Sequence, residues 1–139
     1  SYYGMIVDDH LMAINDFSTE GGLVASLELF DSPKPPDVIF AANDMMAIGV
    51  LKAARTRGFE VPKDVAVIGC DDIDAASLLQ PSLTSIRFPK YDLGKTAAEL
   101  LFRRMSDGKG TIQQLSLQTK PVFRESTNIK DRSIVESIG

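Results

Sequence analysis

Two short apolar segments, residues 38–42 and 65–69, constrain the fold of this chain more than any other feature. Each is apolar throughout, as expected for a strand covered on both faces of a parallel sheet. Between them, residues 45–57 have the composition of a helix, and Gly58 follows at the position where glycine commonly ends one. A buried strand, a helix and a second buried strand predict a parallel sheet with helices on both faces.

The flanking segments extend this alternation. A hydroxyl at Ser18 or Thr19 can accept a hydrogen bond from a free amide of a first helical turn, so a helix is predicted from about residue 20 to residue 30. A third strand is predicted over residues 84–88. The expected fold class is therefore α/β, a three-layer sandwich around a parallel sheet.

A longer helix is predicted between Pro89 and Gly108, residue types that favour a helix start and a helix end. Its apolar residues form one stripe at helical spacing: Leu93, Ala97, Leu100, Leu101 and Met105. Beyond it the sequence predicts a turn at Lys120-Pro121 and a polar tail from Ser126.

Composition excludes several classes of protein. The chain has 139 residues, enough for one domain, and a net charge of −4 from 19 acidic and 15 basic residues. No basic cluster exceeds Arg103-Arg104, so the chain is not expected to bind nucleic acid by itself. No apolar run approaches the roughly 20 residues that span a membrane. A single cysteine, Cys70, and no signal segment indicate the cytoplasm, and a start at Ser1 without methionine suggests a fragment.

Polar pairs follow two of the predicted strands: Asn43-Asp44 after the first and Asp71-Asp72 after the second. In an open parallel sheet, ligands bind outside the carboxyl ends of the strands. We expect Asp44 to cap the following helix, which leaves Asn43 free to face the crevice. An amide both donates and accepts, and a carboxylate accepts, so Asn43 and Asp71 suit a polyhydroxylated or amide-bearing ligand.

A different interpretation of the acidic loop has to be kept. Asp71, Asp72 and Asp74 follow a buried strand and could hold Mg²⁺ for phosphoryl transfer, as in haloacid-dehalogenase-like phosphatases. Alanines at positions 75 and 76 fit that motif poorly. The ligand-binding interpretation requires no metal, no cofactor and no enzymatic activity.

The helix after Asp44 has a wider apolar surface than one sheet-facing stripe needs. Its apolar members are Met45, Met46, Ala47, Ile48, Val50, Leu51, Ala53 and Ala54. Either the helix is buried entirely within its own domain, or it packs against a second protein, for which flexible methionines are well suited.

Three motifs carry a resemblance to a known family. PDVIFAANDMMAIGVLKAARTRGFEVPKDVAVIGCDD, then PSLTSIRFPKYDLGKTAAELL, then FRESTN resemble, in order and spacing, the effector-binding domain of the LacI/GalR family of transcriptional repressors. The resemblance implies a periplasmic-binding-protein-like architecture (type I), in which two α/β subdomains are hinged around a small-molecule site. Residues 1–139 look like mainly the C-terminal subdomain, and residues 89–108 resemble the helix that crosses into the other subdomain.

The resemblance also implies roles for individual residues. Asn43 and Asp71 match the positions that contact the effector, a sugar or a nucleobase-like metabolite. Phe40 matches a strand position that reaches the pocket in some members, where a ring could stack on the ligand; the alternative is plain core packing. Met45 and Ile48 fall in the family's dimer interface, so a homodimer is implied.

Some parts of the family pattern are missing. The helix-turn-helix head through which such repressors bind DNA, the hinge helix and the first half of the N-terminal subdomain have no counterpart in this sequence. Lys90 stands where some members have an apolar or aromatic residue. An extracellular or periplasmic sugar-binding protein would share the fold and the site, and it remains the main alternative.

Overall fold

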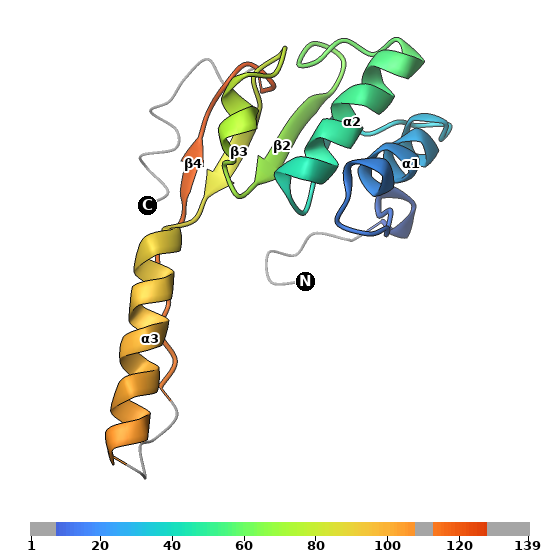
Figure 1. Cartoon of the computed structure of the whole chain (residues 1–139). Coiled ribbons are helices and arrows are strands. Elements are labelled where there is room, and N and C mark those ends of the chain that lie inside the picture. Colours follow the sequence, from blue (N-terminus) through green and yellow to red (C-terminus); the bar gives the residue numbers. More distant parts are fainter. Residues whose placement is uncertain (1–7, 108–112, 128–139) are drawn as a thin grey trace.

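A four-stranded sheet forms the centre of the computed structural model, which describes residues 8–107 and 113–127. The strands are β1 (Val38–Phe40), β2 (Ala66–Cys70), β3 (Thr84–Arg87) and β4 (Lys120–Val122), and they lie in the order β1-β2-β3-β4 (Figure 1). The first three are parallel, whereas β4 runs antiparallel to β3. The predicted parallel α/β sheet is therefore confirmed.

Two helices, α1 (Thr19–Phe30) and α2 (Asp44–Arg57), pack against each other and against the sheet. The core between them is made of small and branched apolar side chains: Phe30, Ile39, Ala41, Ala47, Val50, Ala53, Ala54, Val65, Val67, Ala76 and Leu83. The 3₁₀ turn η2 (Asp74–Ser77) follows β2 and contributes Ala76, and a second 3₁₀ turn, η1 (Asp9–Leu11), precedes α1. None of the described helices is long and apolar enough to cross a membrane.

The helix ends follow from local side chains. Ser18 caps α1, because its hydroxyl oxygen accepts a hydrogen bond from the Gly21 amide at 2.9 Å. Gly58 ends α2 in the left-handed conformation, with φ of 78°, and its amide bonds back to the last turn. At the start of α2 the prediction was wrong: the cap is Asn43, whose side-chain oxygen accepts from the Met46 amide at 2.7 Å, and Asp44 is the first helical residue.

The strands do not meet the expectation of helices on both faces. In β1, Ile39 is buried under the helices, whereas Val38 and Phe40 on the other face are exposed. Both α1 and α2 lie on the Ile39 side, so none of the described helices covers the Phe40 face of the sheet. The strands thus contain more apolar side chains than the described part of the chain buries.

The long helix α3 (Lys90–Asp107) extends away from the sheet (Figure 1), and its predicted terminator, Gly108, lies outside the described residues. The chain returns alongside α3, and Leu115 and Leu117 line a groove with Leu93 and Leu100. Several large apolar side chains on α3 remain exposed: Tyr91, Leu93, Leu101, Phe102 and Met105.

The last described segment differs from its prediction in two respects. Lys120-Pro121 is not a turn but part of β4, where Pro121 is tolerated because β4 is an edge strand. Ser126 does not begin a polar tail: it is fully buried, accepts from the Thr84 amide at 2.8 Å and donates to the Val67 carbonyl at 2.6 Å. These bonds hold the segment after β4 against β2 and β3.

Glycines allow α1 and α2 to approach closely. A Cβ atom added at Gly49 would lie 2.2 Å from the Thr19 carbonyl oxygen, and one added at Gly22 would lie 2.3 Å from the Met46 carbonyl oxygen. Both distances are far below van der Waals contact, and both neighbours are backbone atoms that cannot rotate away. The contact between the helices therefore requires glycine at both positions.

Gly49→Ala is expected to lower the free energy of unfolding by at least about 2 kcal/mol, because the helices must separate to admit the methyl group. Urea unfolding of the chain measures this loss. Gly94→Ala is the matched control, since Gly94 lies in α3 with no neighbour within 4 Å, and it should be neutral or slightly stabilising. Equal stability of the Gly49→Ala variant and the parent chain would contradict the packing argument.

Candidate functional site

Polar residues gather where β1, β2 and β3 end, as the sequence predicted, and Asp44 lies at their centre. It is fully buried; one carboxylate oxygen accepts from the Ser85 hydroxyl at 2.6 Å and the other from the Ile73 amide at 2.8 Å. A Cβ atom at Gly69 would lie 2.1 Å from Asp44 Oδ1, so glycine is needed there. Asp44 thus joins α2 to β3 and to the loop after β2.

Asn43 uses both ends of its amide within the protein. Its oxygen caps α2, and its nitrogen donates to the Phe17 carbonyl at 3.1 Å. The residue was expected to be free to face a crevice, but the cap position belongs to the residue whose extended backbone immediately precedes the helix, with φ of −149° and ψ of 171°. The role of Asn43 as an effector contact stays a prediction, and it would require the amide to bind a ligand in addition to these partners.

Asp71 differs from its polar neighbours in having an available carboxylate. Its amide donates to the Ile86 carbonyl at 2.9 Å, but no hydrogen bond or ion pair engages its side chain among residues 8–107 and 113–127. Its φ angle of 107° is rare for a residue other than glycine. Strained backbone of this kind clusters at ligand sites, so the geometry agrees with a binding role for Asp71.

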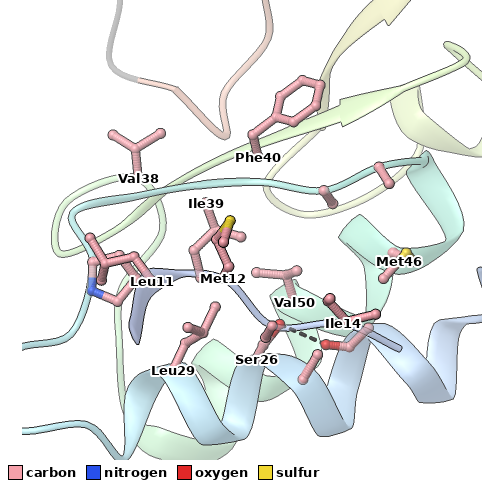
Figure 2. Close-up of a pocket in the computed structure, with 16 residues that line it drawn as sticks. Leu11, Met12, Ile14, Ser26, Leu29, Val38, Ile39, Phe40, Met46 and Val50 are labelled. Atoms are coloured by element: carbon pink, nitrogen blue, oxygen red, sulfur yellow. Dashed lines mark hydrogen bonds between the residues drawn. The ribbon is translucent and has the colours of Figure 1, made fainter. Parts of the chain in front are cut away.

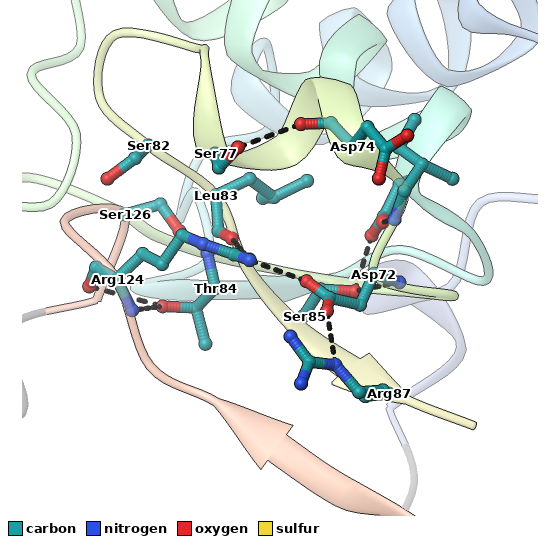
Figure 3. Close-up of polar contacts among 12 residues, drawn as sticks. Asp72, Asp74, Ser77, Ser82, Leu83, Thr84, Ser85, Arg87, Arg124 and Ser126 are labelled. Carbon is teal, nitrogen blue, oxygen red and sulfur yellow. Dashed lines mark hydrogen bonds and ion pairs between the residues drawn. The ribbon is translucent and has the colours of Figure 1, made fainter. Parts of the chain in front are cut away.

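Asp72 is held by two arginines (Figure 3). One carboxylate oxygen lies 2.6 Å from Arg87 Nε and the other 2.6 Å from Arg124 Nη2. Burial alone would raise the pKa of the Asp72 carboxyl, but the hydrogen bonds from Arg124 and Arg87 outweigh it and hold the pKa below its usual range. Asp72 is therefore an ionised anchor inside the site.

Arg87 and Arg124 had no role in the sequence-based interpretation. The FRESTN motif, which contains Arg124, was recognised only as a resemblance, and its partner Asp72 is 52 residues away in the chain. The one available signal was the acidic pair after β2, since buried carboxylates need cationic or hydrogen-bonding partners. Spacing alone does not identify which cations supply them.

Phe40 is not a core residue, so the plain core-packing alternative is wrong. It is 61% exposed, and Figure 2 shows it pointing away from Met46 and Val50 on the helix side of β1. An apolar cavity of about 440 Å³ lies between residues 11–14, α1 and β1, and Phe40 contributes to its lining. Neither Asn43 nor Asp71 lines this cavity, so this cavity does not bring Phe40 together with them.

The acidic loop does not form a metal centre in the described part of the chain. No group of three or more His, Cys, Asp and Glu side chains there could hold a metal ion. Of the three aspartates in the magnesium interpretation, Asp72 faces two guanidinium groups, whose positive charge opposes a cation. Asp71, Asp72 and Asp74 thus lack the arrangement that metal-dependent phosphoryl transfer requires.

Comparison with known proteins identifies the family. A family model described as a periplasmic binding protein-like domain matches residues 3–127, which is most of the chain. The chain belongs to this family. The match and the arrangement of strands together confirm the predicted periplasmic-binding-protein-like fold.

The relatives are transcriptional regulators. The ribose operon repressor of Escherichia coli (strain K12) is 39% identical over 122 residues, which make up 88% of this chain and 36% of that protein. The chain spans about a third of the length of the curated relatives it matches. The recognised resemblance to LacI-family regulators is thereby confirmed.

Solved structures show the same relationship. The structure described as transcriptional regulator CelR in complex with cellobiose is 36% identical, with a TM-score of 0.82 over 90% of this chain and 38% of that one. A LacI family transcriptional regulator from Enterococcus faecalis V583 with bound ribose is 31% identical, with a TM-score of 0.72 over 81% of this chain and 41% of that one.

The lowered pKa of Asp72 predicts a pH dependence of stability. An unfolded aspartate titrates near pH 3.9, so the ionised form stabilises the folded chain above about pH 4, and this stabilisation is lost as the pH falls through the lower folded-state pKa. Asp72→Asn should lower the free energy of unfolding by about 3 kcal/mol at pH 7 and by progressively less below pH 4.

Urea unfolding between pH 7 and pH 2.5 measures this difference. Asp37→Asn is the control, because Asp37 is exposed and its side chain makes no hydrogen bond in the described segments. If Asp72→Asn lowered the free energy of unfolding by the same amount at pH 7 and at pH 2.5, the ion pairs would not stabilise the fold.

Proposed function

We propose that this chain is the C-terminal subdomain of the effector-binding region of a sugar- or metabolite-responsive transcriptional repressor. The observation that carries the proposal is the available carboxylate of Asp71 at the carboxyl end of β2, in a chain whose relatives are repressors and regulators of the LacI family. An enzymatic role has no comparable support, since the relatives carry names of regulators and the acidic loop lacks a metal-binding arrangement.

In this proposal, Asp71 accepts hydrogen bonds from hydroxyl groups of the effector. Asn43 adds the part of its amide that the cap and Phe17 leave available, and Phe40 offers an exposed ring that can pack on the apolar face of a sugar or base. A sugar is the favoured class of effector, because one relative is named a ribose operon repressor and two similar structures contain cellobiose and ribose.

The mechanism requires a second subdomain. Residues 89–108 would form the helix that crosses into it, which agrees with the projection of α3 from the sheet and with its exposed apolar side chains. An effector that contacts both subdomains favours one hinge setting, and the difference in affinity changes the state of a DNA-binding head. Coupling of this kind amounts to about 1–3 kcal/mol. Such a repressor acts in the cytoplasm and needs no cofactor.

Asp71→Asn is expected to weaken effector binding by the full-length protein at least about tenfold, because a hydrogen bond to a charged group is lost. Asparagine tolerates positive φ, so the melting temperature without ligand should change little. Thermal shift and calorimetry with D-ribose, cellobiose and lactose measure the effect. Asp74→Asn, an exposed aspartate in the same loop, is the control.

An unchanged thermal shift in the Asp71→Asn variant would exclude Asp71 from the effector site. Asn43→Ala is a weaker test, since loss of the cap alone destabilises α2 by about 1 kcal/mol, and its affinity must be compared at a temperature where both proteins are folded.

A homodimer is part of the proposal. Met45 is exposed on the outer side of α2, and Ile48, one turn further, is only partly buried. Together they extend the apolar surface of α2 beyond its contact with α1 and the sheet. Apolar side chains exposed in this way, one of them an adaptable methionine, suit a contact with a second copy of the protein.

Met45→Glu and Ile48→Glu should each weaken dimerisation of the full-length protein at least about tenfold, because a charge is buried without a partner. Sedimentation velocity over a range of concentrations measures the change. Val24→Glu serves as the matched control, since Val24 is a similarly exposed apolar residue on the neighbouring helix α1. Dimers of unchanged affinity in both α2 variants would place the interface elsewhere.

A further inference from the structure

The loop that follows β2, residues 71–73, is called the rim loop below. Its backbone conformation is unfavourable and needs stabilising contacts from the rest of the protein. Asp71 and Asp72 have φ angles of 107° and 48°, and two consecutive residues other than glycine are thus in the positive-φ region. Such conformations are disfavoured sterically and persist only where the surrounding structure determines them. The bonds that hold this loop therefore also determine where the Asp71 carboxylate lies.

Three consecutive backbone amides of the loop are held. The amides of residues 71, 72 and 73 donate, in that order, to Ile86 O at 2.9 Å, Ser85 Oγ at 3.0 Å and Asp44 Oδ2 at 2.8 Å. All three acceptors belong to β3 or to the first turn of α2, which are parts of the packed core. The backbone on both sides of Asp72 is thereby fixed.

The side chain of Asp72 supplies the remaining attachment. It is only 5% exposed and lies between Arg124, whose side chain is 16% exposed, and Arg87, whose side chain is 58% exposed. Arg124 is itself anchored, because its Nη1 donates to the Leu83 carbonyl at 2.7 Å. The buried Arg124 contact therefore constrains the loop more than the solvent-facing Arg87 contact does.

We propose that Asp72 is a positioning residue of the effector site, which Arg124 and Arg87 hold so that the strained loop presents Asp71 in one fixed place. The inference rests on the proposed function, in which Asp71 is the residue that contacts the effector. In this inference Asp72 acts through the loop and not by direct contact with the ligand, and each of its carboxylate oxygens binds one of the arginines.

Arg124 also connects the rim loop to the part of the chain that returns from α3. It lies two residues after the end of β4, the strand through which the chain returns from α3. The ion pair with Asp72 therefore ties the rim loop to the returning chain. A displacement of β4 relative to β2 moves Arg124, and through Asp72 it changes the position of Asp71.

The test uses the full-length protein and two measurements. Amide hydrogen exchange over residues 70–74, without ligand, reports how firmly the loop is held. Isothermal titration with D-ribose, cellobiose and lactose reports binding. Asp72→Asn removes the charge while keeping a residue that tolerates positive φ, and it should increase exchange in the loop and weaken sugar binding, each by about tenfold.

The arginine variants provide a graded test that does not depend on one substitution folding well. Arg124→Gln should act nearly as strongly as Asp72→Asn, and the Asp72→Asn/Arg124→Gln double variant should cost less than the sum of the two single variants, because both changes remove the same ion pair. Arg87→Met should have a smaller effect, about threefold, since its ion pair is exposed to solvent.

Asp31→Asn is the matched control. The Asp31 carboxylate accepts two hydrogen bonds from Arg57, at 2.6 and 2.5 Å, so the variant also breaks an aspartate–arginine pair, but between the ends of α1 and α2. It should leave loop exchange and sugar affinity within about twofold of the parent protein. A general loss of stability would instead increase exchange throughout the sheet in every variant.

Unchanged exchange of residues 70–74 in Asp72→Asn would overturn the positioning role, whether or not any sugar binds. Faster exchange with unchanged sugar affinity would support the positioning of the loop but refute Asp71 as the effector contact, which is a failure of the proposed function. The two failures are therefore distinguishable.

Discussion

The buried carboxylate of Asp44 is the interaction on which the arrangement of the rim depends. A carboxyl group is costly to bury without hydrogen-bond partners, and here the Ser85 hydroxyl and the Ile73 amide offset that cost. These two partners belong to β3 and to the loop after β2, whereas Asp44 belongs to α2. One side chain thus fixes three elements at the carboxyl end of the sheet, and the absence of a side chain at Gly69 makes room for it.

Among the described polar residues at the carboxyl end of the sheet, most have side chains that bond to other parts of the protein, and one does not. Asn43 caps a helix and bonds to Phe17, and Asp72 is enclosed by two arginines. Asp71 is the exception, with its amide bonded and its carboxylate without a partner in the part of the chain described. The proposed function assigns ligand recognition to Asp71, the group that folding does not require, while its neighbours provide rigidity.

The sheet and its helices were predictable because their signals are local: apolar strands, hydroxyl and glycine at helix ends, prolines between elements. What could not be predicted depends on partners distant in sequence. Lys120-Pro121 became a strand because β3 offers it an edge, and Ser126 is buried because Thr84 and Val67 bond to it. At the site, the position of Asp71 at the strand end was foreseeable, whereas the division of roles between Asn43 and Asp44 depended on backbone geometry that two adjacent capping residues do not specify.

The contact between Gly22 and Gly49 has a mechanical consequence. Because the two helix backbones touch without side chains between them, α1 cannot slide along α2 without steric overlap. The helices therefore move together, so a displacement of α2 also displaces α1. Deformation is left to the two connections that lead from β3 to α3 and from α3 back to β4.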